Sequence, residues 1–281
     1  MSEENKNNEK PIFGRKIFFI APPPNIFPFV TNKLRELEYE IYVIPEYKKA
    51  REILRKNPDS ICFCNLDDQK LSVKSWLNYI KSYYDDDKLK STIMGVLSSR
   101  SRKNDRENFL MQPNLGAGYI VTSVGNTELV DSIKSILDVN GAKGRRQYVR
   151  ANTANNPMAQ IVCEKNNQMF TMQLQDISSV GFACRANNED APLFVKNSLL
   201  KDFTLRLEKK QITASAVIFA TKPGDDFSIL VMLFLPNQPA MNKGAIQEFI
   251  ANTLEQTIIG DTQHIEDDQT DYEHYGEEEN A

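Results

Sequence analysis

The most constraining feature of this sequence is a change of pattern near its middle. Before residue 140, short apolar segments typical of buried strands alternate with segments whose apolar residues recur at helical spacing. After residue 144, strand-like segments follow one another with no helix between most of them. Residues 140–144 separate the two halves and contain two glycines, which favour a helix stop and a linker. A chain of 281 residues can bury two separate cores.

The first half is predicted to form a parallel sheet. Its expected strands are residues 16–20, 40–44, 60–64, 92–97 and 119–122. Its expected helices lie near residues 29–37 and at 47–56, 73–83 and 127–139. Strands that alternate with helices imply a sheet covered on both faces. We therefore expect residues 13–139 to form a doubly wound α/β domain.

The second half is predicted to form an antiparallel barrel. Its expected strands are residues 158–164, 169–176, 181–185, 203–207, 212–221 and 227–235. Turn residues such as Asn166-Asn167 separate them. A helix capped by Asn242 is expected to close the domain and to run to residue 259. Closure into a barrel would remove exposed strand edges.

The two ends of the chain differ from the rest in composition. Residues 1–12 are polar and are predicted to be disordered, and residues 260–281 to form an acidic, solvated tail. Nine acidic residues lie from Asp261 onward, so the rest of the chain is net basic. Both histidines, His264 and His274, also lie in this tail. The body therefore has no histidine for general-base or metal chemistry, and we expect no enzyme.

Cysteine usage and hydropathy favour a cytoplasmic protein. The four cysteines lie in apolar, strand-like surroundings, which predicts buried free thiols in a reducing compartment; they are Cys62, Cys64, Cys163 and Cys184. Cys62 and Cys64 have no accompanying histidine or cysteine pair, so we expect no metal site. No apolar run approaches the ~20 residues of a membrane span, and the polar start has no signal-peptide pattern. The basic stretch 98–106 lacks interleaved aromatics and favours a solvated loop over a nucleic-acid patch.

Three arginines open the second half within six residues. They are Arg145, Arg146 and Arg150. A guanidinium group makes two-point contacts with phosphate oxygens and with the O6/N7 edge of guanine. The cluster therefore indicates a phosphate-bearing, guanine-containing ligand.

A second motif follows about thirty residues later. Asp176 supplies a carboxylate that can accept from guanine N–H groups, and Ser178 supplies a hydroxyl that can donate to phosphate. Gly181 would let backbone approach a ligand closely. Together with the arginines, this set suits a small anionic nucleotide better than a long nucleic acid.

In this order the two motifs resemble the PilZ domain, the bacterial receptor module for cyclic di-GMP. Arg146 and Arg150 fill its RxxxR element, and residues 176–181 fill its [D/N]xSxxG element. The resemblance implies a six-stranded barrel with a closing helix over residues 145–259. It also implies that the arginines grip phosphate and guanine while Asp176 reads guanine N–H groups. Arg145, just before RxxxR, favours two stacked nucleotides per chain.

The first half resembles, in its order of elements, the receiver domain of response regulators. A working receiver needs an acidic pair after its first strand, where Ala21 and Pro22 stand. It needs an aspartate at the end of the third strand, where we expect Asn65. Residues 122–124 offer no lysine after the fifth strand, and only the hydroxyl of Ser98 fits. The resemblance implies a degenerate receiver that contacts a protein partner.

The expected function is a cytoplasmic cyclic di-GMP effector without other cofactors. Nucleotide binding would order a loose linker at residues 140–144, change the domain arrangement and alter contacts with an unidentified partner of the first domain. The resemblance implies outputs in motility, adhesion or envelope control. One alternative is a PilZ-like scaffold that no longer binds nucleotide. The other is a response regulator phosphorylated on Asp67 or Asp68.

Overall fold

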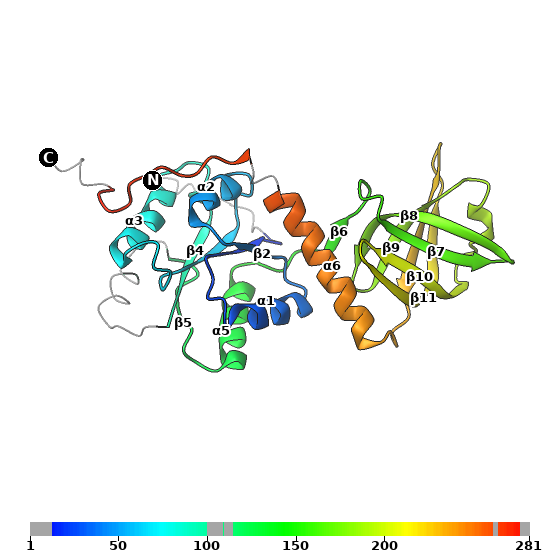
Figure 1. Cartoon of the computed structure of the whole chain (residues 1–281), viewed down its shortest axis with the longest axis horizontal. Coiled ribbons are helices and arrows are strands. Elements are labelled where there is room, and N and C mark those ends of the chain that lie inside the picture. The colour runs from blue at the N-terminus through cyan, green and yellow to red at the C-terminus, as the bar shows by residue number, and fades with distance from the viewer. Residues whose placement is uncertain (1–12, 100–108, 110–114, 261–263, 276–281) are drawn as a thin grey trace, which may run out of the picture. The chain divides into compact units, whose positions relative to one another are not determined.

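The structure, a computed structural model, describes residues 13–99, 109, 115–260 and 264–275 (Figure 1). The chain divides into two compact units. Unit 1 comprises residues 1–147 and 261–281, and unit 2 comprises residues 148–260. Residues 1–12, which were expected to be disordered, lie outside the described residues, as does most of the basic stretch 98–106.

Unit 1 contains the predicted parallel sheet. Its strands are β1 (Ile17–Ile20), β2 (Ile41–Ile44), β3 (Ile61–Asn65), β4 (Ile93–Ser98) and β5 (Tyr119–Val121). They are hydrogen-bonded in the order β2-β1-β3-β4-β5, with every pair parallel. Chain order reverses between β1 and β3, so the carboxyl ends of these two strands form the switch point of the doubly wound sheet.

Helices cover both faces of this sheet. They are α1 (Phe27–Glu36), α2 (Tyr47–Arg55), α3 (Val73–Tyr84) and α5 (Asn126–Val139). The apolar sides of α1 and α5 share one core with Phe19 and Phe63, whereas α2 and α3 lie on the opposite face (Figure 1). Because both faces are covered, β1 and β3 are buried along their whole length, which explains their continuous apolar sequence.

The cysteine prediction is confirmed. All four cysteines are buried and unpaired. Burial raises the pKa of the Cys163 thiol to about 11 and raises the pKa of Cys184 further. These thiols are therefore protonated at neutral pH and serve as core residues.

Residues 140–144 differ from the loose linker that the sequence suggested. Gly141 has a φ of +69° and ends α5, and the Ala142 N–H donates to the Leu137 carbonyl over 3.0 Å. This is a Schellman helix end, and Ala142 is buried against the core. The Gly14 N–H donates to the Gly141 carbonyl over 2.9 Å. The segment is therefore part of unit 1, because Gly141 serves the end of α5 and Gly144 lies against Gly14.

Residues 264–275, hereafter the C-terminal segment, also differ from the solvated tail that was expected. Tyr272 is only 3% exposed, and the carboxylate of Asp268 contacts Arg51 of α2. The segment runs along α2 and α3 of unit 1 (Figure 1). Its acidic composition hid this packing, because carboxylates and tyrosines here pair with specific groups instead of facing water.

Unit 2 is the predicted barrel with its closing helix. Its elements are β6 (Arg150–Asn152), β7 (Ala159–Lys165), β8 (Gln168–Ser178), β9 (Gly181–Ala186), a 3-10 turn (Ala191–Leu193), β10 (Leu199–Leu207), β11 (Lys210–Lys222), β12 (Ser228–Phe234) and α6 (Ala240–Ile259). The strands pair in the order β8-β7-β10-β11-β12-β9, and β9 returns to β8. Six antiparallel strands therefore close on themselves, while β6 is an added short strand beside β8 that the sequence did not predict.

Local signals explain the hairpin and the helix of this unit. Asn166 and Asn167 both have positive φ, as the two-residue turn between β7 and β8 requires. Helix α6 buries Ile246, Phe249 and Ile250 in the barrel core. The prediction of Asn242 as N-cap is wrong: Pro239 takes that position, and the Asn242 side chain donates to the Thr213 carbonyl over 2.7 Å.

Barrel closure depends on a close approach at Gly181. This residue starts β9, which pairs with β8 on one side and with β12 on the other. A Cβ atom on Gly181 would lie 2.3 Å from the carbonyl oxygen of Met232 on β12. No side chain fits there without moving the β12 backbone, so the glycine is required by packing between strands.

We predict that Gly181→Ala destabilises unit 2 by about 1–3 kcal/mol, since overpacking must be relieved by backbone shifts. The barrel transition in calorimetry should fall, while the transition of unit 1, reported by the fluorescence of Trp76, stays unchanged. Gly244 in α6 is the matched control, because a Cβ there meets no atom within 4 Å. Gly244→Ala should stabilise the helix by about 0.5–1 kcal/mol. An unchanged barrel transition in Gly181→Ala would contradict the packing argument.

Candidate functional site

Strand β8 brings the two sequence motifs together. On one edge its last residues pair with β6, with Arg150 opposite Ser178 and Asn152 opposite Asp176. The Arg150 Nη1 and Asp176 Oδ1 atoms are 3.9 Å apart. Both side chains keep access to solvent, with exposed fractions of 51% and 38%. The second arginine of RxxxR therefore lies beside the aspartate of the second motif.

A β-bulge aims Asp176 outward. Leu174 pairs with Cys184 on β9, but the next pair joins Asp176 to Ala183, so Gln175 is an extra residue. Leu174 and Ile177 both point into the core, and Asp176 lies on the outer face between them. Bulges of this kind re-aim side chains at functional positions. The carboxylate thereby sits on the barrel wall instead of in the core.

Two apolar residues lie in the same row as this carboxylate on the outer face. Ile177, Phe182 and Met232 pair with one another across the sheet, and all three point into the core. Side chains alternate along a strand, so the neighbouring row points outward. The outward neighbours across the sheet are therefore Asp176, Ala183 and Val231 in one row. Ala183 is only 7% exposed, so Asp176 is the polar member of this row.

Ser178 and Gly181 serve the barrel itself. Ser178 is 3% exposed, and its hydroxyl donates to the Gly181 carbonyl over 3.0 Å across the β8–β9 turn. Gly181 admits the backbone of β12 rather than a ligand. In this conformation the two residues fix the turn that follows Asp176. The phosphate and ligand contacts that the sequence suggested for these two residues stay predictions.

The first two arginines are exposed and lie outside regular structure. Arg145 and Arg146 are among the last residues of unit 1, and both are exposed to solvent. Three exposed guanidinium groups within six residues, with Arg150 on β6, can each offer a two-point contact to phosphate oxygens. These arginines supply cationic donors, and Asp176 supplies an acceptor.

Asn152 is a neighbour that the sequence analysis missed. It is exposed, lies on β6 two residues after Arg150, and pairs across the strands with Asp176. Its side-chain oxygen accepts from the Ala154 N–H over 3.0 Å. Three residues are too few for a period-two pattern, so the Arg-Ala-Asn strand carried no signal beyond the arginine.

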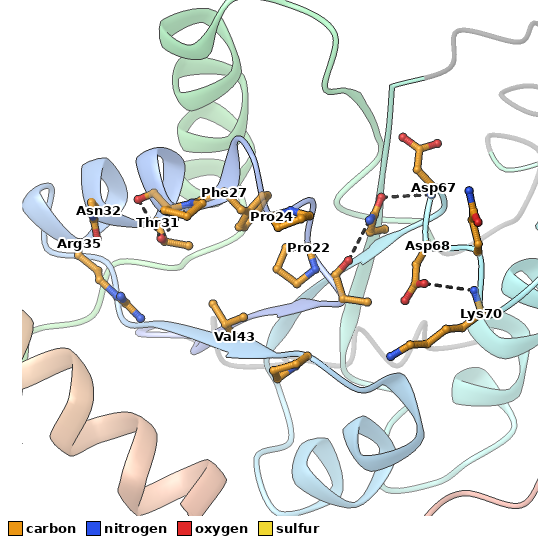
Figure 2. A pocket seen from close by; sticks show the side chains of 15 residues that line it. Pro22, Pro24, Phe27, Thr31, Asn32, Arg35, Val43, Asp67, Asp68 and Lys70 are labelled. Atoms are coloured by element: carbon orange, nitrogen blue, oxygen red, sulfur yellow. Dashed lines mark hydrogen bonds between the residues drawn. The ribbon is translucent and has the colours of Figure 1, made fainter.

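Unit 1 has a separate pocket of about 860 Å³ at the carboxyl ends of β1 and β3. Figure 2 shows Arg35 at one end and Asp67, Asp68 and Lys70 at the other, with apolar side chains between them. Pockets at this switch point are common in doubly wound sheets.

The chemistry of this pocket differs from that of a phosphoacceptor site. Asn65 ends β3, and its side-chain amide donates to the Ala21 carbonyl over 2.8 Å. The Asp67 carboxylate accepts from the Ser98 hydroxyl over 2.9 Å and from the Ser99 N–H over 2.6 Å. One oxygen of Asp68 accepts from the Lys70 N–H. These groups tie loops to the sheet, and the described residues contain no group of three or more metal-ligating acids, cysteines or histidines.

The chain is similar to several solved structures. The PilZ domain of YcgR from Escherichia coli, solved with c-di-GMP, is 14% identical with a TM-score of 0.37, and the match covers 43% of this chain and 99% of that one. MrkH from K. pneumonia, in complex with c-di-GMP, is 19% identical with a TM-score of 0.34; the match covers 42% of this chain and 55% of MrkH. No family model matches the sequence, and no curated protein matches it significantly.

A further similarity is to the chemotaxis response regulator CheY4 of Vibrio cholerae. It is 13% identical with a TM-score of 0.37, and the match covers 44% of this chain and 98% of CheY4. All three similarities are weak in sequence and in score, so function is inferred from the residues of the site. Among the described helices, none is long and apolar enough to cross a membrane.

Proposed function

We propose that this chain is a cytoplasmic effector that binds cyclic di-GMP on the outer face of its barrel. The observation that carries this proposal is the exposed pair Arg150 and Asp176, 3.9 Å apart on β6 and β8. An arginine and a carboxylate at this spacing can contact a phosphate and the N–H edge of a guanine in one ligand. The PilZ-like order of the motifs supports the same ligand.

Each group has a distinct role in the proposed complex. Arg146 and Arg150 hold phosphate and guanine, and Asp176 accepts from the guanine N–H groups. Asn152 is placed to add a polar contact beside Asp176. Ser178 and Gly181 act indirectly, because they hold the turn after Asp176 in shape.

The two alternatives receive less support. A scaffold without a ligand would have no use for an exposed carboxylate that a bulge aims outward beside an exposed arginine. A phosphorylated response regulator would need an available acceptor and a metal site. Asp67 instead has both oxygens hydrogen-bonded to the end of β4, and the amide of Asn65 occupies the end of β3.

Loss of either motif arginine should weaken nucleotide binding. A hydrogen bond to a charged group is worth about 1.5–3 kcal/mol, and about 1.4 kcal/mol corresponds to a tenfold change. Arg150→Ala and Arg146→Ala should therefore each raise the dissociation constant for cyclic di-GMP by about one to two decades in calorimetry. Asp176→Ala should reduce the preference for cyclic di-GMP over cyclic di-AMP.

The matched control for this measurement is Arg206→Ala. Arg206 is an exposed arginine on β10, a strand that pairs with neither β6 nor β8. Its replacement should leave affinity unchanged, which separates local contacts from loss of overall positive charge. Equal affinities in the Arg146 and Arg150 variants and in wild type would reject the site.

We further propose that two nucleotides bind per chain. Cyclic di-GMP can form a stacked pair, and the guanidinium of exposed Arg145 can lie over a guanine face. Calorimetric titration should saturate at two nucleotides in wild type and at one in Arg145→Ala. Saturation of the wild type at one nucleotide, with ligand far above the dissociation constant, would contradict this stoichiometry.

Signalling is proposed to act through residues 145–149. Residues 140–144 are already held by hydrogen bonds within unit 1, so the segment left to be ordered is shorter than the sequence suggested. Ordering costs on the order of 1–2 kcal/mol per residue, which several charge-assisted contacts to the ligand can offset. The ligand would thereby favour one arrangement of the two units and its partner contacts, with the output in motility, adhesion or envelope control.

Amide exchange tests this coupling. Cyclic di-GMP should slow exchange in residues 145–150 and change the small-angle scattering of wild type. Residues 140–142 should be protected with or without ligand, because their N–H groups already donate to carbonyls at the end of α5. Arg150→Ala serves as the control that should show neither change. Protection confined to residues 176–181, with unchanged scattering, would show that binding does not reach the linker.

A further inference from the structure

The C-terminal segment is bound to unit 1 as a peptide would be. Residues 265–271 form no helix or strand. The main chain is held at two points: the Asp268 N–H donates to the Lys48 carbonyl over 3.0 Å, and the Asn78 side chain donates to the Tyr272 carbonyl over 2.8 Å. Main-chain bonds of this kind provide affinity in peptide recognition, while side chains provide specificity.

Two side chains of the segment contact Arg51 of α2, and one of them also contacts Tyr79 of α3. Tyr272 packs edge-on against Tyr79 with ring centroids 5.0 Å apart, and its hydroxyl accepts from Arg51 over 3.2 Å. The Asp268 carboxylate contacts the same guanidinium over 3.0 Å and accepts a hydrogen bond from the Tyr272 hydroxyl. An aspartate and a tyrosine four residues apart therefore share one buried arginine.

Further contacts continue along α3. The Ser75 hydroxyl donates to the Glu273 carboxylate, and the Tyr275 hydroxyl donates to Asp85 over 2.7 Å. The groups that receive the segment lie on α2, on α3 and in the turn after α3; we call them the docking groove, and they are Lys48, Arg51, Ser75, Asn78, Tyr79 and Asp85.

The docking groove keeps its internal partners without the segment. Arg51 also contacts Asp86 over 3.4 Å and lies over the Tyr83 ring at 5.0 Å. The Tyr79 hydroxyl bonds to the Tyr83 hydroxyl over 2.5 Å and to the Tyr47 carbonyl over 3.1 Å. Removing the segment therefore leaves the cation paired and the aromatic cluster intact, so the site is preorganised for a peptide.

We propose that the docking groove binds an acidic peptide in which a tyrosine follows an aspartate by four residues. The C-terminal segment occupies the groove within the chain, and a segment of a partner protein with the same pattern displaces it. The residues that α2 and α3 present set these requirements. Arg51 selects the aspartate and the tyrosine hydroxyl, Tyr79 selects the ring, and the Ser75 hydroxyl selects the acid after it.

The test uses the full-length chain and a fluorescent peptide with the sequence of residues 264–275. In wild type the resident segment is present at an effective concentration of roughly millimolar, so the labelled peptide should bind only at similar concentrations. The double variant Asp268→Ala/Tyr272→Ala frees the groove, and there the peptide should bind at least about ten times more tightly in fluorescence anisotropy. The measurements are made without nucleotide and do not depend on the proposed function.

Matched controls define specificity. Glu266→Ala changes an exposed acid of the same segment and should bind the peptide as weakly as wild type. Adding Arg51→Ala to the double variant should abolish binding, as should a peptide with alanine in place of its tyrosine. Equal binding to the double variant and to wild type would overturn the proposal, as would a concentration-dependent dimer of wild type that exchanges the segment between copies.

A second experiment tests the proposal if the double variant does not fold. A protease site replaces residues 261–263 in an otherwise wild-type chain, and cleavage turns the native segment into a free peptide. After cleavage and dilution the segment should leave, and the labelled peptide should take its place. A segment that stays bound and does not exchange would show that it is a fixed part of unit 1 and not a resident of a docking site.

Discussion

Strand β8 is the constraint on which unit 2 and its candidate site depend. It pairs with β7 along its first half, with β6 along its end, and with β9 on its other edge. The same eleven residues thus pair with β7, close the barrel against β9 and carry Asp176 and Ser178 of the second motif. A bulge lets them do so, because it keeps Leu174 and Ile177 in the core while it turns Asp176 to the surface. The closure of the barrel and the position of Asp176 are therefore set by one register.

The fold of both halves was predictable because periodicity reports burial. Fully apolar strands marked the parallel sheet, and consecutive strands with asparagine turns marked the barrel. The motif arginines and Asp176 were selected from their chemistry and from the PilZ resemblance, and their ligand contacts stay predictions. Strand β6 was not predicted, because three residues cannot show a period. The bulge at Gln175 was not predicted either, because it follows from long-range pairing that no local pattern encodes. Gly181 was noted for a ligand, whereas only three-dimensional packing reveals the approach of β12.

Composition gave a wrong expectation for two segments. The glycines of residues 140–144 suggested a flexible linker, and the acidic residues of the C-terminal segment suggested a solvated tail. Gly141 ends a helix, and the Gly14 N–H bonds to its carbonyl, so the residues meant as a spacer belong to the first domain. In the C-terminal segment, burial alone would raise the pKa of the Asp268 carboxyl. Hydrogen bonds from Thr270, Tyr272 and Arg51 outweigh that effect and lower it. A carboxylate in such an environment is a structural partner, and charge counts alone do not distinguish it from a solvated one.

The division of the chain has a consequence for how the protein is made. Unit 1 is interrupted in sequence, since all of unit 2 lies between its main part and the C-terminal segment. On the ribosome, chain growth at ~5–20 residues per second leaves unit 1 without that segment for roughly 6–23 seconds while residues 148–260 are added. During this interval the surface around Arg51 and Tyr79 lacks its contacts with the C-terminal segment. Nascent unit 1 is thus open to early capture by another peptide before its own has been synthesised.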